Sequence, residues 1–365
     1  MKKLIYIILI ILLSSCVRKS LYLRDVLPHD KCRISTLINI DATLQISTNI
    51  NTDIKNNLLY AWNDSIYGPL GYTIPKSIKG LFFMVDGYNK RSLLYEEEFI
   101  VGEPKTTMIK THTYYDILFH SNTLSTGYKF EVNYPYYISA PLTTTRSSYN
   151  FEEDFELCPQ VEEQYAVVKN NLYIDPEKDN VTKKNENGVW VYYYNIDVKL
   201  IPVTYIYIVQ LKIIDDDKDY PMDVDSCLTM IMSGVAKEKE LFTLKTTDKR
   251  CILESKNIKP LQIKENNYIF VERFLTYGLV NDYKSSWGYG NLTYELGIDL
   301  HLSTGEIKTG KINISNLLYE KPTGGVITIE LKNSDIHRKS DIDESGGFSV
   351  DVQPWSEEIN VEIAI

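Results

Sequence analysis

The feature that most restricts the fold is an apolar run at residues 203–214 (VTYIYIVQLKII). Its β-branched and aromatic side chains favour strands, and they would cover both faces of a strand, as in the centre of a sandwich. Just before the run, residues 196–200 (IDVKL) alternate apolar and charged side chains, which indicates a strand with one buried face. Pro202 lies between them and cannot donate to a ladder, so it predicts an edge, bend or bulge.

The rest of the chain repeats short strand-like segments between turn signals. No window keeps the i, i+3, i+4, i+7 spacing of an amphipathic helix over a helical length. The count of 28 Tyr against 11 Phe also suits strands that have one buried face and one face exposed to solvent. Many short strands with Gly-rich turns predict an all-β fold of sandwich type. Further strands are predicted at residues 33–45, 78–85, 93–101, 106–110, 114–120, 228–232, 251–254, 269–276, 294–302, 307–314, 326–331, 348–352 and 359–365.

The length of 365 residues favours two domains, because single hydrophobic cores stop growing at about 250–300 residues. Between residues 140 and 185 the sequence becomes polar and acidic, with one strand or short helix expected between residues 162 and 172. We therefore expect an N-terminal β-sandwich domain at 32–145, a linker region at 146–186 and a C-terminal β-sandwich domain at 187–365. Residues 16–31 are polar, contain Pro28 and predict a tether.

The first fifteen residues have the pattern of an export signal. Lys2 and Lys3 precede an apolar run at residues 4–13, which is about half of the roughly 20 residues needed to span a bilayer. The sequence LSSC then ends at Cys16 and is similar to the lipobox of bacterial lipoproteins. That resemblance implies cleavage before Cys16 and a diacylglycerol on its thiol. The alternative is an ordinary cleaved signal followed by a coincidental cysteine.

Four cysteines remain besides Cys16, and none forms a C-x-x-C element, so the sequence does not indicate a zinc site. Export permits disulfides. Cys227 and Cys251 lie on segments predicted to be neighbouring strands, which makes them the favoured pair. Buried free thiols are the alternative, and it is the one we prefer.

The sequence does not indicate an enzyme, a cofactor or a metal. Its five histidines are scattered, and it contains no zinc-protease motif, hydrolase elbow or phosphate-binding loop. A net charge of −10 without a basic stripe argues against nucleic acid as a partner. The acidic residues at 215, 217 and 219 have the spacing of a calcium loop, but Tyr220 stands at the glycine position and Ser226 at the final glutamate position. We therefore expect a plain hairpin turn there.

Several segments together resemble the fimbrillin-like lipoproteins of anaerobic Gram-negative bacteria. The resemblance covers roughly residues 33–365. It departs at residues 111–113, where family members often have a glycine before the tyrosine. The resemblance implies two transthyretin-like, Greek-key β-sandwich domains in tandem. The segments that carry it are the lipobox, Trp62 with residues 67–69 (YGP), residues 111–119 (THTYYDILF), 202–214, 232–236 (MSGVA), 346–352 (GGFSVDV), Trp355 and 359–363 (INVEI).

The resemblance also implies a function. Members of the family are fimbrial stalk, tip and anchor subunits, and such subunits join by β-strand addition. We expect an outer-membrane lipoprotein held by lipid on Cys16, displayed at the cell surface, and acting as an anchoring or non-polymerising fimbria-like subunit. Family stalk subunits are trimmed after a basic residue in the first domain, and Lys55 is a conceivable site, although Lys76 and Lys79 are equivalent on sequence grounds. The alternative function is a glycan-binding surface lipoprotein, which would need a shelf of exposed aromatic side chains.

Overall fold

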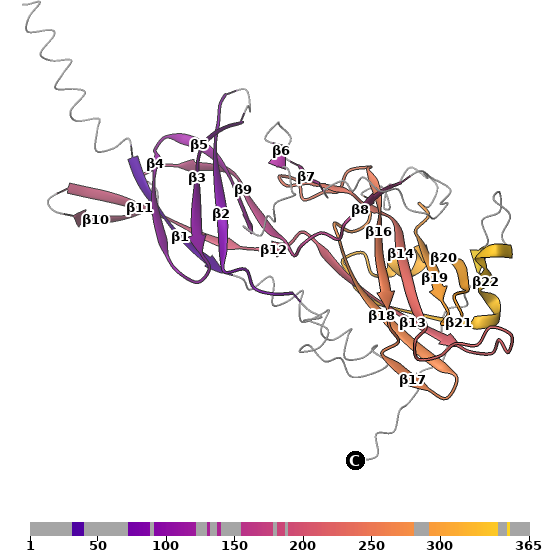
Figure 1. Ribbon diagram of the computed structural model, residues 1–365. Helices are drawn as coiled ribbons and strands as arrows, with labels where there is room; N and C mark the ends of the chain where they lie inside the picture. Colours follow the sequence, from indigo (N-terminus) through magenta and orange to yellow (C-terminus); the bar gives the residue numbers. More distant parts are fainter. Residues whose placement is uncertain are drawn as a thin grey trace, which may run out of the picture. The chain divides into compact units, whose positions relative to one another are not determined.

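Strands dominate the computed structural model of the chain (Figure 1). Within the described ranges the helices are short: α4 (Ser315–Glu320) and the 3-10 helices η2 (Asn333–Asp335) and η3 (Lys339–Asp341). The all-β prediction is therefore confirmed. No helix in this part of the chain is long and apolar enough to cross a membrane. The structure describes residues 31–39, 72–87, 91–121, 130–131, 137–139, 155–177, 181–186, 189–280, 292–341 and 349–350.

The chain divides into two compact units whose sequence ranges interleave. The first unit takes in Met1–Asp41, Pro75–Asn122 and Ala166–Ile201, and the second takes in Ala42–Ile74, Thr123–Tyr165 and Pro202–Ile365. These ranges differ from the expected domains at 32–145 and 187–365 with a linker at 146–186.

The expected linker contains three strands. β9 and β10 belong to the first unit, whereas β8 adds to a sheet of the second. β10 was hard to recognise because it is polar (VTKKNE), and it is polar because it lies at the edge of its sheet.

The first unit contains two sheets (Figure 1). One has the order β10-β11-β1-β4, in which β1 pairs in parallel with β11 and antiparallel with β4. The other has the order β12-β9-β5-β2-β3 and is antiparallel where its registers are defined. The strands are β1 (Lys31–Asn39), β2 (Ser77–Val85), β3 (Arg91–Ile100), β4 (Lys105–Lys110), β5 (Thr113–Ser121), β9 (Tyr165–Ile174), β10 (Val181–Glu186), β11 (Val189–Lys199) and β12 (Ile201–Pro202).

Phenylalanine rings from adjacent strands form the core of the first unit. Phe82, Phe99 and Phe119 are fully buried, and their ring centroids lie 5.6–6.4 Å apart. Gly80 makes this packing possible, because a Cβ there would lie 2.8 Å from the Phe99 ring. The predicted alternation along β11 is also confirmed, since Ile196 and Val198 are buried between exposed polar neighbours.

The second unit contains three sheets. Their orders are β17-β18-β13-β21, β22-β20-β19-β14-β16-β8 with β23 also pairing with β20, and β15-β7-β6. The strands are β6 (Phe130–Glu131), β7 (Tyr137–Ser139), β8 (Glu156–Cys158), β13 (Tyr205–Ile214), β14 (Cys227–Ala236), β15 (Glu238–Glu240), β16 (Arg250–Ile258), β17 (Gln262–Lys264), β18 (Asn267–Thr276), β19 (Glu295–His301), β20 (Ile307–Asn313), β21 (Gly325–Lys332), β22 (His337–Arg338) and β23 (Ser349–Val350).

The core of the second unit lies between its two larger sheets. β18 of the four-stranded sheet contacts β14 and β16 of the other sheet, so the two sheets pack face to face. β13 lies inside its sheet between β18 and β21 and is buried on both faces along most of its length, as its sequence predicts.

Pro202 lies in β12, at the edge of the five-stranded sheet β12-β9-β5-β2-β3, where its missing N–H costs no ladder hydrogen bond.

Candidate functional site

Two of the residues that the sequence singled out, Cys16 and Lys55, lie outside the described residues. Of the two other lysines considered for trimming, Lys76 is exposed, whereas Lys79 lies within β2. β2 pairs with β3 on one side and β5 on the other. A protease needs an extended, accessible backbone, so the structure does not favour Lys79 as a trimming site.

The pairing of Cys227 with Cys251 is not found, and both residues are free thiols. They do lie on neighbouring strands, β14 and β16, as expected. However, Cys251 pairs with Val235 at the other end of β14. Val235 lies eight residue steps along β14 from Cys227, which corresponds to roughly 26 Å, and a disulfide requires Cα atoms about 4.4–6.8 Å apart.

The thiol neighbour of Cys251 is Cys158, on the parallel strand β8. Their side chains form a hydrogen bond, which lowers the pKa of Cys158 and raises the pKa of Cys251. Both are buried, whereas Cys227 is half-buried. Because β8 falls in the expected linker, sequence reasoning had no reason to bring Cys158 next to Cys251.

The acidic segment after β13 is more than a turn. β13 belongs to the four-stranded sheet and β14 to the other large sheet, so the segment between them crosses from one sheet to the other, and the expected plain hairpin is wrong. Carboxylates in this crossing are bound by other parts of the unit. Asp216, for example, accepts hydrogen bonds of 2.9 Å from the backbone N–H and the hydroxyl of Ser334.

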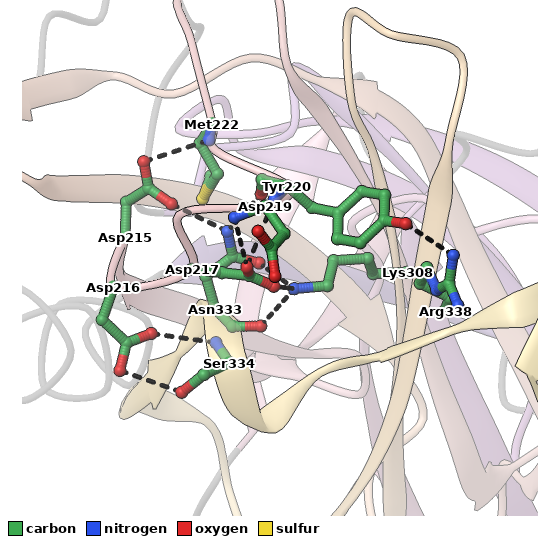
Figure 2. Close-up of polar contacts among 10 residues, drawn as sticks. All are labelled: Asp215, Asp216, Asp217, Asp219, Tyr220, Met222, Lys308, Asn333, Ser334 and Arg338. Carbon is green, nitrogen blue, oxygen red and sulfur yellow. Dashed lines mark hydrogen bonds and ion pairs between the residues drawn. The ribbon is translucent and has the colours of Figure 1, made fainter.

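At the centre of this region lies a group that we call the Lys308 cluster: Lys308, Asn333, Asp215 and Asp217 (Figure 2). Lys308 extends from β20, and its Nζ donates to Asp217 Oδ2 at 2.7 Å. The same nitrogen donates to the backbone oxygen and to Oδ1 of Asn333, each at 2.6 Å. Lys308 is only 2% exposed, and Asn333 is fully buried. Three acceptors thus surround an ammonium group that is withdrawn from water.

The amide nitrogen of Asn333 is also fixed. Nδ2 donates to Asp215 Oδ1 at 2.7 Å and to the backbone oxygen of Tyr220 at 2.8 Å. Asp215 accepts a further hydrogen bond at its other carboxylate oxygen, from the backbone N–H of Met222 at 3.0 Å. These contacts define which atom of the Asn333 amide is oxygen and which is nitrogen.

The electrostatics of the cluster follow from these contacts. The hydrogen bond from Lys308 holds the pKa of Asp217 below its usual value. No group of three or more metal-ligating side chains occurs among the described residues. The cation that Asp217 contacts is the ammonium of Lys308.

Sheet edges provide a second kind of candidate site, since their unpaired backbone groups can accept a further strand. β3 is an edge strand of the first unit and is charged. Lys79 pairs with Glu96 at 3.1 Å, and Lys105 pairs with Glu97. Among the described strands, β21 lies at an edge of its sheet in the second unit, and its first five residues, Gly325 to Ile329, have no charged side chain. The β3 edge thus presents charged side chains, which disfavour pairing with another chain, whereas the first part of β21 presents none.

An aromatic pair lies on the first unit. Tyr114 of β5 is 51% exposed and stacks at a tilt against Tyr173 of β9, with ring centroids 4.7 Å apart. The two residues are directly opposite in the antiparallel register. A pair of accessible rings is the kind of surface on which a sugar ring can stack.

Sequence reasoning missed the Lys308 cluster, although a signal was present. In the predicted strand at 307–314, Lys308 falls on the same face as Gly310 and Ile312, and all three are buried. A lysine in phase with the buried face of a strand requires an internal partner. The identity of that partner was not accessible, because Asp217 is 91 positions away.

No protein-family model matches the chain, and no curated protein sequence matches it either. Among solved structures, the chain is similar to a candidate adhesin from Bacteroides ovatus, with 11% identity, a TM-score of 0.48, and coverage of 91% of this chain and 96% of that one. A candidate polysaccharide-binding protein from Bacteroides thetaiotaomicron has 11% identity, a TM-score of 0.40 and coverage of 86% and 99%. The fimbrial anchor protein Mfa2 from Porphyromonas gingivalis has 9% identity, a TM-score of 0.40 and coverage of 84% and 95%. Two of these neighbours are thus described as an adhesin and a fimbrial anchor, and the third as a polysaccharide-binding protein.

Proposed function

We propose that this protein is an outer-membrane lipoprotein that acts as an anchoring, non-polymerising subunit of a fimbria-like surface structure. The observation that carries the proposal is the position of β1. It pairs along one side with β11, from Arg33 to Asn39, and along the other with β4, from Lys31 to Thr36. The first strand of the described part of the chain is thus an inner strand of its sheet.

An inner first strand suits an anchor for a mechanical reason. Fourteen residues separate Cys16 from the start of β1 at Lys31, a tether of at most roughly 50 Å. A load pulling on the lipid therefore reaches β1 directly. To extract β1, the load would have to break backbone hydrogen bonds on both sides of the strand rather than on one.

The same position bears on polymerisation and trimming. A sheet position that the chain fills with its own β1 is not open to a strand from a partner. Cleavage after Lys55 would leave β1 and the lipid on a fragment separate from the rest of the fold. We therefore expect the anchor to remain uncut. We expect its partner to add at a sheet edge.

The lipid attachment is tested by Cys16→Ala. We expect the variant to be released from membranes or to remain unprocessed, because acyl chains, which gain about 0.8 kcal/mol per buried methylene, are the only membrane attachment proposed. Cys227→Ala is the matched control and should fractionate like the parent protein. Unchanged partitioning of the Cys16 variant into the detergent phase would refute the proposal.

A second function, glycan binding at the surface, is favoured by one observation, the Tyr114–Tyr173 pair. If these rings hold a sugar, Tyr114→Ala should abolish binding to an immobilised glycan panel while the protein stays folded, as its cooperative thermal unfolding would show. Equal binding by the variant, or none by the parent protein, would exclude a glycan site at this pair.

A further inference from the structure

We propose that Lys308 and Asn333 become joined by an intramolecular isopeptide bond. In this reaction Nζ of Lys308 attacks Cγ of the Asn333 side chain, an amide forms between them, and the amide nitrogen of Asn333 leaves as ammonia. The inference concerns the second unit alone and does not depend on the proposed function.

The two reacting atoms are already close. Nζ lies 2.6 Å from Asn333 Oδ1, and a carbonyl bond is about 1.23 Å long, so Cγ lies roughly 3–3.8 Å from Nζ. That distance overlaps the roughly 3–3.5 Å of a near-attack arrangement. The contact from Nζ to the backbone oxygen of the same residue, also 2.6 Å, holds the lysine against Asn333.

Each nitrogen has a carboxylate at hydrogen-bond distance. Asp217 Oδ2 lies 2.7 Å from Nζ and is placed to accept the proton that the ammonium must lose before it can attack. Asp215 Oδ1 lies 2.7 Å from Nδ2, the leaving nitrogen. Nζ loses two protons in total and Nδ2 gains two, so an ammonium side chain and a primary amide become a secondary amide and an ammonium ion. No oxidant or reductant is needed.

Burial favours the reaction. Asn333 is fully buried and Lys308 nearly so, which limits the access of water to the reacting carbonyl. Lys308 lies 25 positions from Asn333 and 91 positions from Asp217, so the three side chains meet only in the folded unit. We therefore expect the bond to form after folding.

The product would connect the two large sheets of the second unit. Lys308 belongs to β20 in the sheet that contains β19 and β14, and Asn333 directly follows β21 in the sheet that contains β13. A covalent bond between them would prevent the sheets from separating and would close a loop between residues 25 positions apart.

The test is the intact mass of the denatured, full-length purified protein, after incubation at neutral pH until the mass no longer changes. We expect a mass below that of the processed sequence by one ammonia. Proteolysis should yield one branched peptide containing both Lys308 and Asn333, with no cleavage after Lys308. A folded protein that keeps its full mass would overturn the proposal.

Two variants sharpen the test. Asp217→Asn keeps the size and acceptor oxygen of the side chain but removes the base, and we expect it to fold and to keep its full mass. Lys332→Arg changes an exposed lysine next to Asn333 and should still lose ammonia. If Asp217→Asn loses ammonia as fast as the parent protein, the role given to Asp217 is wrong. If Lys332→Arg abolishes the loss, the lysine has been misassigned.

Discussion

Each unit contains a buried cluster of side chains, and different interactions stabilise the two clusters. In the first unit, Phe82, Phe99 and Phe119 lie on adjacent strands and pack ring against ring. In the second, Lys308 and Asn333 are buried just as deeply but depend on carboxylates, and the Asn333 to Asp215 hydrogen bond spans 118 positions of sequence. An apolar core tolerates approximate neighbours, whereas a buried ammonium requires particular ones.

The largest expected effect is in the aromatic core. Phe119→Ala should lower the free energy of unfolding by about 3–5 kcal/mol, because it removes a fully buried ring that packs on two others. Chemical denaturation checks this value. Tyr114→Ala, in the same strand but half exposed, is the control and should change the free energy by no more than about 1 kcal/mol, the contribution of a cross-strand aromatic pair. Equal effects would mean that the core of the first unit is misplaced.

A smaller effect is expected from Lys308→Met, measured against parent protein that still has its full mass and therefore has no Lys308–Asn333 bond. The substitution keeps most of the side-chain volume but leaves both Asn333 oxygens without this donor, which should cost about 1–3 kcal/mol in the free energy of unfolding. A variant as stable as the parent would show that the cluster contributes nothing net. Lys311→Arg, in the same strand, is the control and should leave stability unchanged.

The smallest of these effects on the free energy of unfolding should appear on mild acidification. It should arise in the first unit and not in the second. Burial of His120 in the first unit lowers its pKa from the usual value of about 6.5 to about 4. Below pH 6.5 the unfolded chain takes up a proton that the folded unit excludes. The free energy of unfolding should therefore fall by roughly 1–2 kcal/mol between pH 6.5 and pH 5.

The Lys308 cluster should respond in a different pH range. The pKa of Asp217 is lowered, so its contribution is present above the unfolded value of about 3.9 and is lost only as the pH falls through the lower folded value. His120→Gln should remove the loss between pH 6.5 and pH 5, and Asp217→Asn should not. Denaturation curves of the three proteins at pH 6.5, 5 and 3.5 test this order, and the reverse assignment would contradict it.

The features that could be predicted from the sequence are those with a local apolar pattern. The strands at 78–85, 114–120 and 203–214 were found because their apolar patterns are local and strong. β8 has only three residues and β10 is polar, so neither has a local pattern. Helix α4 has six residues, too few for a helical period to show.

The candidate sites were harder to predict than the strands, because they depend on pairings distant in sequence. Cys251 was paired with Cys227 on the correct strands but at the wrong ends, since strand adjacency does not fix the register. The Lys308 cluster brings together a crossing between sheets, a strand and a short 3-10 helix. No segment of the sequence contains more than a part of it.

The central claim, an uncut anchor that retains its own first strand, is tested most directly by the mass of the mature protein extracted from its native envelope. We expect an intact chain that begins at a lipid-modified Cys16 and continues through Lys55 to Ile365. A mature chain that begins after Lys55 or another basic residue, without lipid, would contradict it and would indicate a polymerising subunit whose sheet has been opened for a partner's strand.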